Sequence, residues 1–220
     1  MPSDDARTQG VRVKICGVTS AADARMVADA GADYLGMIFV SRSPRAITVD
    51  DGRAIAAAVP EGIQRVALTV DADDELISAI SRIGVDWIQM HGTEAPERVA
   101  EVRASTGLRV MKAVGVRDAG DLESIDIYAP VADQILVDAK PPKGAAVPGG
   151  HGVTFDWRLI ADRSWSTPWM LAGGLAPGNV AEAVGLTNAS QVDVASGTEA
   201  APGVKDPELV RAFIAAAKGV

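Results

Sequence analysis

The sequence predicts an α/β protein with one domain, folded as a closed (β/α)₈ TIM barrel. Short runs rich in Val, Ile and Leu alternate with Ala-rich segments of helical periodicity along the whole chain, which is typical of parallel strands joined by helices. A pattern of Gly, a small residue, Asp, an aromatic and an aliphatic residue recurs at 31–35 and 84–88, with a weaker copy at 132–136. Each copy lies where a helix ends and an even-numbered strand begins. This regular phase favours an eightfold barrel over an open doubly wound sheet.

The first half of the chain predicts four strand–helix units. Thr19 or Ser20 is expected to cap the first helix, and Gly31 is expected to end it. The expected strands are 11–16, 34–39, 65–70 and 87–90, and the expected helices are 20–30, 49–59, 74–83 and 95–105.

The second half repeats the scheme. The expected strands are 109–114, 134–137, 169–172 and 191–195, and the expected helices are 119–128, 155–161, 177–184 and 207–217. A stretch rich in Pro, Lys and Gly at 139–153 follows the sixth strand. Long loops in compact domains are either functional or disordered, and its place at the C-terminal face favours function. Residues 1–10 are expected to form a polar N-terminal extension, and residues 11–220 the barrel.

Charge and cysteine content limit the partners and the location. Lys and Arg total 21 and Asp and Glu total 29, so the formal net charge is -8, and there is no long basic run. Nucleic acid and membrane are therefore not expected as partners, whereas a small phosphorylated substrate can still bind at one local site. Cys16 is the single cysteine, so a reducing cytoplasm is the expected location. Neither a signal peptide nor an apolar run of about 18 residues is found in the sequence.

Two glycine-containing turns at the ends of the last two strands predict a phosphate site. Gly173 and Gly174 follow the seventh strand, and Ser196 and Gly197 follow the eighth. Such turns expose backbone N–H groups, and in (β/α)₈ barrels the loops after strands seven and eight often bind phosphate. The alternative is that these glycines only make tight turns, but two such motifs in adjacent positions favour the phosphate site.

Cys16 and Asp138 are the candidate base and acid. Both are expected at the C-terminal ends of barrel strands, where the active sites of this fold lie. A positive environment can lower the pKa of a thiol, and a partly desolvated carboxyl group can keep its proton long enough to donate it. The alternatives are that Cys16 is a small buried hydrophobic residue and that Asp138 caps a loop.

Three more polar side chains are expected at the same mouth. Arg45 is a candidate for a bidentate contact with a substrate carboxylate, or else an exposed residue in a surface ion pair. Gln89 and His91 at the end of the fourth strand are candidate substrate-binding residues, and His91 is alternatively a proton shuttle or a hydrogen-bonded structural histidine. His151 is the only other histidine and shares no metal-ligand spacing with His91, so no metal site is expected.

A series of short motifs runs in order over nearly the whole chain. They are Lys14-Ile15-Cys16-Gly17, Ser43-Pro44-Arg45, Gln89-Met90-His91-Gly92, Asp138, Pro148-Gly149-Gly150, Phe155-Asp156-Trp157, Ala172-Gly173-Gly174-Leu175 and Pro202-Gly203-Val204-Lys205-Asp206. Together they resemble the phosphoribosylanthranilate isomerase family of tryptophan biosynthesis. The first tetrapeptide and the Gly-Gly-Leu turn are weak signals alone, whereas the ordered set is highly specific.

The resemblance implies an Amadori rearrangement of N-(5-phosphoribosyl)anthranilate to 1-(2-carboxyphenylamino)-1-deoxyribulose 5-phosphate, with no cofactor or metal. It implies that Asp138 protonates the furanose ring oxygen and that Cys16 removes the C2′ proton from the resulting Schiff base. Arg45 is then expected to face the anthranilate, and the last two turns to hold the phosphate. Ala195 stands where the family often has a second Ser, and His151 where a small hydroxyl residue is common, so both positions depart from the usual pattern.

Two alternative functions stay open at this level. One is another phosphate-sugar barrel, such as the related histidine-pathway isomerase or indoleglycerol-phosphate synthase. The former would need paired aspartates at strands one and five, but these strands end in Cys16 and near Ala113, and the Lys and Glu set of the latter is not evident. The other is a non-catalytic barrel that binds a phosphorylated ligand, against which the Cys16 and Asp138 pair argues. Either a monomer or a homodimer is compatible with the sequence.

Overall fold

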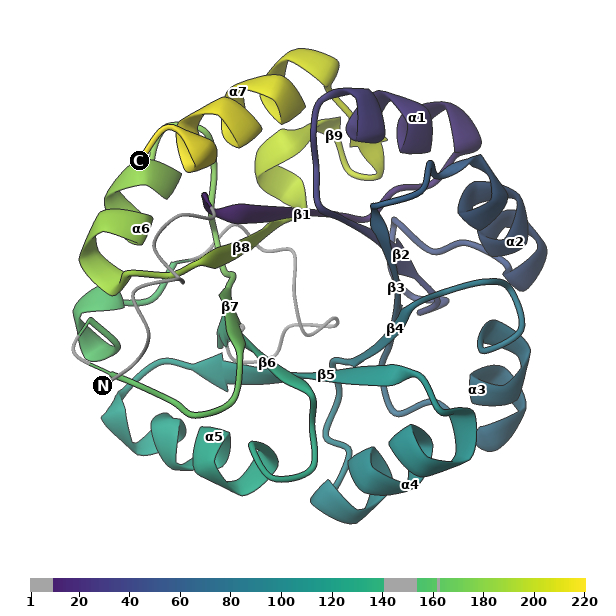
Figure 1. Ribbon diagram of the computed structural model, residues 1–220, viewed down its shortest axis with the longest axis horizontal. Coiled ribbons are helices and arrows are strands. Elements are labelled where there is room, and N and C mark those ends of the chain that lie inside the picture. The colour runs from purple at the N-terminus through teal and green to yellow at the C-terminus, as the bar shows by residue number, and fades with distance from the viewer. Residues whose placement is uncertain (1–9, 141–153, 162) are drawn as a thin grey trace.

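Eight short apolar runs form the strands of a closed parallel barrel, β1 to β8 in chain order (Figure 1). Each strand pairs with its neighbours in the chain, and β8 closes the barrel on β1. The computed structural model describes residues 10–140, 154–161 and 163–220. The strands are Arg12–Cys16 (β1), Tyr34–Ile38 (β2), Gln64–Thr69 (β3), Trp87–Met90 (β4), Arg109–Val116 (β5), Gln134–Ala139 (β6), Trp169–Leu171 (β7) and Gln191–Val194 (β8). The predicted fold class is therefore confirmed.

Helices form a ring around the outside of the barrel (Figure 1). The α-helices are Ala21–Asp29 (α1), Val49–Ala58 (α2), Asp74–Ile80 (α3), Pro96–Thr106 (α4), Glu123–Tyr128 (α5), Val180–Thr187 (α6) and Pro207–Lys218 (α7), and the 3₁₀ helices are Ala119–Leu122, Trp157–Leu159 and Ser196–Thr198. Ser20 caps α1 as predicted, because its side chain accepts a hydrogen bond from the N–H of Asp23 at 3.0 Å. Among the described residues, we find no helix with the length and apolar character needed to cross a membrane.

The recurring Gly-x-Asp pattern has a structural explanation. Asp33, Asp86 and Asp133 each precede an even-numbered strand, and their carboxylates accept backbone N–H groups of β1, β3 and β5 at 2.8, 2.8 and 2.9 Å. Gly31 and Gly84 have φ angles of 91° and 87°, so they turn the chain from helix towards strand in a conformation that favours glycine. The repeat thus ties neighbouring strands together at their N-terminal ends, opposite the predicted site.

The sixth strand is longer than predicted. It runs to Ala139 rather than ending at residue 137, because β5 itself runs to Val116 and pairs with it, Gly115 opposite Asp138. Asp138 therefore lies within a strand and not in a loop. The rest of the predicted functional loop, 141–153, with its Pro-Gly-Gly motif and His151, lies outside the described residues, as do residues 1–9 of the predicted extension.

Two helices in the second half were predicted wrongly. The expected helix 155–161 is only the 3₁₀ turn Trp157–Leu159, which Asp156 closes by accepting the N–H of Arg158 at 3.1 Å. The expected helix 177–184 begins later, at Val180, because the side chain of Asn179 holds the preceding residues in a turn.

A short antiparallel hairpin after β8 was also missed. Its strands are β9, Glu199–Ala201, and β10, Val204–Lys205. Gly203 has a φ of 82°, and a Cβ there would lie 2.8 Å from the carbonyl oxygen of Pro44. The hairpin therefore packs against the loop that follows β2.

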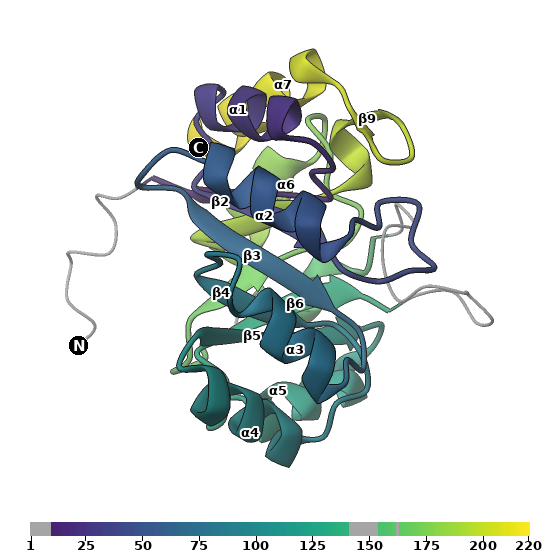
Figure 2. The ribbon, with the colours of Figure 1, turned by 90° about the vertical axis from the view of Figure 1, so that its right-hand side faces the viewer.

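Alternate residues of each strand point into the barrel and fill it. One buried cluster consists of Tyr34, Val66, Trp87, Met111, Ala113, Leu136, Met170 and Ala172. A second cluster, Cys16, Ile38 and Leu68, lies at the C-terminal ends of β1, β2 and β3. Seen from the side, β3 and β6 point towards the end of the barrel at which β9 also lies (Figure 2). That end is the mouth in which the sequence places the candidate site.

Candidate active site

Cys16 is the last residue of β1 and lies in the mouth of the barrel. Its residue exposure is 2%, and it packs with Ile38 and Leu68. Gly36 on β2 leaves room for the thiol, because a Cβ at that position would lie 2.8 Å from the Cys16 Sγ. Cys16 is a free thiol. Its burial agrees with the alternative that Cys16 is a small buried hydrophobic residue, yet Cys16 also has charged neighbours.

A buried lysine lies two residues before Cys16, on the same face of β1. Lys14 is fully buried, and its Nζ donates to the Asp193 Oδ1 at 2.8 Å, across the pairing of β1 with β8. Because both side chains lie on this face, the charge of Lys14 acts on the Cys16 thiol and opposes the rise in its pKa. Neither Lys14 nor Asp193 was selected from the sequence, although a lysine between the apolar residues of a buried strand was an available signal.

Arg45 belongs to a second buried ion pair at this mouth. Its Nε and one Nη donate to the two carboxylate oxygens of Glu199, both at 2.7 Å, and its side chain occupies the space that a Cβ on Gly17 would need. The reading of Arg45 as an exposed surface residue is therefore wrong, since its exposure is 6%. Lys205 completes the group by donating to Glu199 at 3.0 Å and to the carbonyl of Ala195 at 2.9 Å. Glu199 and Lys205 were not among the selected residues.

Burial and ion pairing shift the pKa values on this side in different directions. Burial raises the pKa of the Cys16 thiol above its ordinary value, although Lys14 opposes the rise. Burial tends to lower the pKa of Lys14, but Asp193 and Cys16 outweigh it and leave the pKa raised. Burial lowers the pKa of Lys205, with Glu199 opposing. The lysine beside the thiol therefore stays protonated, and the thiol loses its proton less readily than an exposed one.

Asp138 has a different environment on the other side of the mouth. Its Oδ2 lies 3.1 Å from the His91 Nε2, and its Oδ1 accepts the backbone N–H of Ala139 at 2.8 Å. Its side chain is 14% exposed, so the carboxyl group is largely buried but keeps some contact with solvent. The structure joins two predicted site residues here, and it supports the reading of His91 as a hydrogen-bonded histidine.

Gln89 extends this hydrogen-bond chain into the barrel. It is fully buried, and its Nε2 lies 2.8 Å from the His91 Nδ1, while its Oε1 has no partner among the described residues. A neutral His91 that donates Nε2–H to the Asp138 carboxylate accepts the amide N–H at Nδ1. If Asp138 instead donates its proton to Nε2, a half-turn of the amide presents Oε1 to Nδ1–H. The chain can therefore accommodate either protonation state of Asp138.

The turns after β7 and β8 lie against each other beside Asp138. Gly173 and Gly174 have φ angles of 87° and 64°, and a Cβ on Gly173 would lie 3.0 Å from the Asp138 Oδ1. A Cβ on Gly197 would collide with the carbonyl oxygen of Leu175, so glycine allows the two turns to meet. Within the described part of the chain, the backbone hydrogen bonds leave the N–H groups of Gly173, Gly174, Ser196 and Gly197 without an acceptor.

Asn179 holds the first of these turns in shape. Its Oδ1 accepts the N–H of Ala176 at 2.7 Å, and its Nδ2 donates to the carbonyl of Gly174 at 3.0 Å. The turn thus keeps its N–H groups free while its carbonyl is occupied, which is the arrangement an anion requires. The described residues contain no cluster of three or more His, Cys, Asp or Glu side chains suited to a metal ion.

Comparison with known proteins identifies one family. The family model described as N-(5'phosphoribosyl)anthranilate (PRA) isomerase matches residues 13–216. A Cereibacter sphaeroides protein named N-(5'-phosphoribosyl)anthranilate isomerase is 58% identical over 210 residues, which cover 95% of this chain and 99% of the relative. A crystal structure of phosphoribosyl anthranilate isomerase from Thermotoga maritima has a TM-score of 0.86 and 37% identity, over 96% of this chain and 100% of the other. Another, in complex with reduced 1-(o-carboxyphenylamino)-1-deoxyribulose 5-phosphate, has a TM-score of 0.82 and 36% identity, with the same coverage.

Proposed function

Because the chain belongs to the N-(5'-phosphoribosyl)anthranilate isomerase family, we propose that Cys16 and Asp138 carry out the acid–base chemistry of this isomerisation. The protein is an isomerase of tryptophan biosynthesis that acts on a small phosphorylated substrate. The observation that supports the two roles is the contrast between the two sides of the mouth. Cys16 lies beside a protonated lysine, whereas Asp138 is linked to a hydrogen-bond chain of His91 and Gln89.

Asp138 acts first as the general acid. Its proton goes to the furanose ring oxygen, the bond from that oxygen to C1′ breaks, and the anthranilate nitrogen forms a Schiff base with C1′. His91 and Gln89 act through Asp138 as positioning residues, because His91 orients the carboxyl group and Gln89 lies behind the imidazole, away from the substrate. This assigns to Gln89 and His91 a role beside the acid and not a direct hold on the substrate.

Cys16 acts second as the general base. Its thiolate takes the proton from C2′, and the electron pair of that C–H bond forms the double bond of an enolamine, which tautomerises to the ketone. A thiolate of raised pKa is a stronger base than an ordinary one, although less of it is present at neutral pH. One proton is donated and one accepted, so exchange of Cys16 and Asp138 with solvent restores the starting state.

The remaining site residues hold the two anionic ends of the substrate. The unpaired N–H groups of Gly173, Gly174, Ser196 and Gly197 bind the phosphate, whose binding energy positions C2′ at a distance. Arg45 faces the anthranilate carboxylate. Glu199 occupies its Nε–H and one Nη–H, so three of its five N–H donors remain for the substrate. All of these residues belong to one chain, so the proposed site is compatible with a monomer and with a homodimer.

Turnover of the isomerase tests these roles. Anthranilate and phosphoribosyl pyrophosphate are converted by a phosphoribosyltransferase, and the loss of the fluorescent phosphoribosylanthranilate is followed after the protein is added. We expect Cys16→Ala and Asp138→Asn each to lower kcat by at least about 100-fold, the scale of general acid–base contributions. Asp133→Asn, a carboxylate change at the opposite end of the barrel, is the control and should keep kcat close to that of the unaltered protein. Turnover like that of the unaltered protein in both site variants would overturn the assignment.

A further inference from the structure

The buried charges around Cys16 do not balance. The groups are the cations Lys14, Arg45 and Lys205, and the carboxylates Asp193 and Glu199. Their side-chain exposures lie between 0% and 10%, so solvent screens them little. Three cations and two carboxylates leave one positive charge, and such a charge is costly to bury unless an anion accompanies it. The ionisable group in contact with this cluster is the Cys16 thiol, whose thiolate would make the cluster neutral.

Lys14 is the cation best placed to act on the thiol. Lys205 and Arg45 are already engaged, since Lys205 donates to Glu199 and to a backbone carbonyl, and Arg45 gives two donors to Glu199. The ammonium group of Lys14 has one hydrogen-bond acceptor among the described residues, Asp193, and its charge favours the Cys16 thiolate more than that of any other neighbouring group. It also lies on the same strand as Cys16, so the barrel wall fixes their separation.

We propose that Lys14, held in place by Asp193, is the positioning residue that makes Cys16 available as a thiolate. The inference rests on the proposed role of Cys16 as the base and adds to it the group on which that role depends. Without the ammonium group, the thiol would keep Ile38 and Leu68 as packing neighbours and would lose the charge that most favours the thiolate. The anionic substrate is a second candidate for neutralising the cluster, and a titration without substrate separates the two.

Direct titration of the thiol tests the proposal without relying on turnover. Cys16 is the only cysteine in the chain, so protein grown with Cβ-labelled cysteine gives one NMR signal that follows its ionisation. We expect Lys14→Met to move the midpoint upwards by about one pH unit or more, the size of effect that a neighbouring opposite charge produces. The pH dependence of kcat/KM should move in the same direction. A midpoint that stays at the value of the unaltered protein would overturn the proposal.

Two further variants guard against a misleading result. Lys112→Met removes another buried lysine, on β5, and should leave the Cys16 midpoint in place. If Lys14→Met does not fold because Asp193 is left unpaired, Lys14→Met with Asp193→Leu leaves no unpaired charge and should still raise the midpoint, because Lys14 affects the thiol more than Asp193 does. A shifted midpoint in a protein without isomerase turnover would contradict the proposed function and not the link between Lys14 and Cys16.

Discussion

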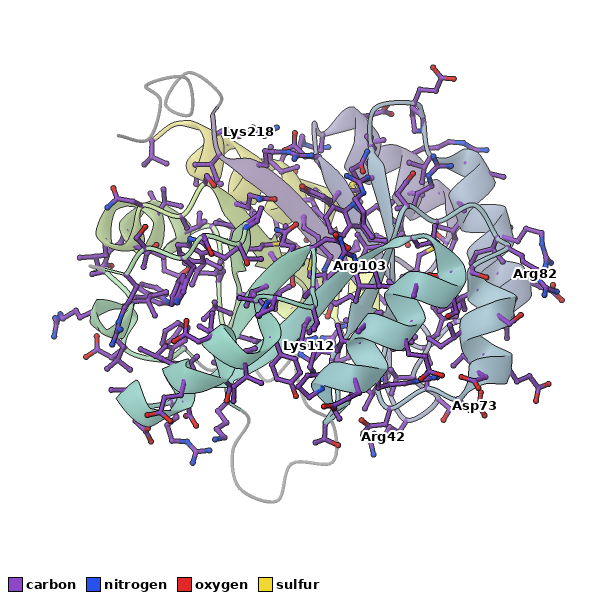
Figure 3. The ribbon with its side chains drawn as sticks, turned by 60° about the horizontal axis from the view of Figure 1, so that its bottom comes forward. Arg42, Asp73, Arg82, Arg103, Lys112 and Lys218 are labelled. Atoms are coloured by element: carbon purple, nitrogen blue, oxygen red, sulfur yellow. The ribbon has the colours of Figure 1, made fainter. Side chains whose placement is uncertain are left out.

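Lys14 and Lys112 are both buried lysines paired with a carboxylate, but they lie on opposite faces of the barrel wall. Lys14 points inwards to Asp193 and to the thiol of Cys16. Lys112 follows the inward-facing Met111, so it points outwards, towards the helix layer (labelled in Figure 3). There its ammonium group donates to Glu94 at 2.9 Å and to two backbone carbonyls at the end of β4, at 2.8 and 3.3 Å.

The difference concerns what surrounds each charge. All three N–H donors of Lys112 have oxygen acceptors, and its ammonium group lies 5.2 Å from the ring centre of Tyr128, so this lysine fixes the turn after β4. Lys14 has one oxygen acceptor among the described residues, Asp193, and a titratable thiol two residues along the same face of its strand. A buried charge with a full set of fixed acceptors serves structure, whereas one in contact with a titratable group can serve chemistry. The predictions below test this contrast.

The largest effect is expected from removing Glu94, the carboxylate that pairs with Lys112. Glu94→Ala should lower the free energy of unfolding by about 3–5 kcal/mol, because it leaves the charge of Lys112 buried without its counter-ion. It also removes the acceptor of the N–H groups of Asp71 and Gly92. Urea unfolding measures the change. Adding Lys112→Met should restore part of the stability. If Glu94→Ala alone is as stable as the unaltered protein, the structural role of the pair is refuted.

A smaller effect is expected from adding a methyl group to a strand glycine, either on β2 beside Cys16 or on β5 on the other side of the barrel. Gly36→Ala places a Cβ 2.8 Å from the Cys16 Sγ, so we expect a loss of about 1–3 kcal/mol in stability and a lower kcat. Gly115→Ala on β5 meets its nearest atoms at 3.5 Å, an ordinary contact, and should change stability by less than about 1 kcal/mol. Urea unfolding and turnover of the two variants compare the sides. Equal effects would show that the space around Cys16 is not restricted.

The smallest effect concerns the pH dependence of stability. The pKa of Cys16 is raised in the folded protein, so the folded state holds this proton more tightly than the unfolded state does. Its contribution to stability is complete below the ordinary thiol pKa of about 8.5 and is lost as the pH rises through the folded value, by at most about 1.4 kcal/mol per pH unit. Cys16→Ala should make the alkaline fall in the urea midpoint shallower, whereas Lys112→Met should not change its slope. An unchanged slope in Cys16→Ala would contradict the raised pKa.

The strands and the motif positions could be predicted because they depend on local sequence. Buried parallel strands appear as short runs of branched aliphatic residues, and the Asp of each repeat marks a fixed point before a strand. Cys16, Asp138 and the two glycine turns follow from their places at strand ends. The shape of a short turn was harder to predict, as at Asn179, where side-chain hydrogen bonds delay a helix by three residues.

The charge network of the mouth could not be predicted from local patterns. Lys14 and Asp193 are 179 residues apart in the chain, and Arg45 and Glu199 are 154 apart. Their pairing depends on barrel closure and on a hairpin that the sequence analysis missed. Sequence alone left Arg45 either exposed or facing a substrate, whereas in the structure Arg45 is buried and paired with Glu199 of the same chain.

The most direct test of the central claim compares two double variants that each replace a whole buried pair. These are Lys14→Met with Asp193→Leu and Lys112→Met with Glu94→Leu, measured by the pH dependence of kcat/KM. We expect the first to lose at least about 10-fold at neutral pH, the effect of a one-unit rise in the pKa of the base, and to regain activity as the pH rises. The second should keep the pH profile of the unaltered protein. The same profile in both double variants would contradict the claim that the inner lysine serves the chemistry of Cys16.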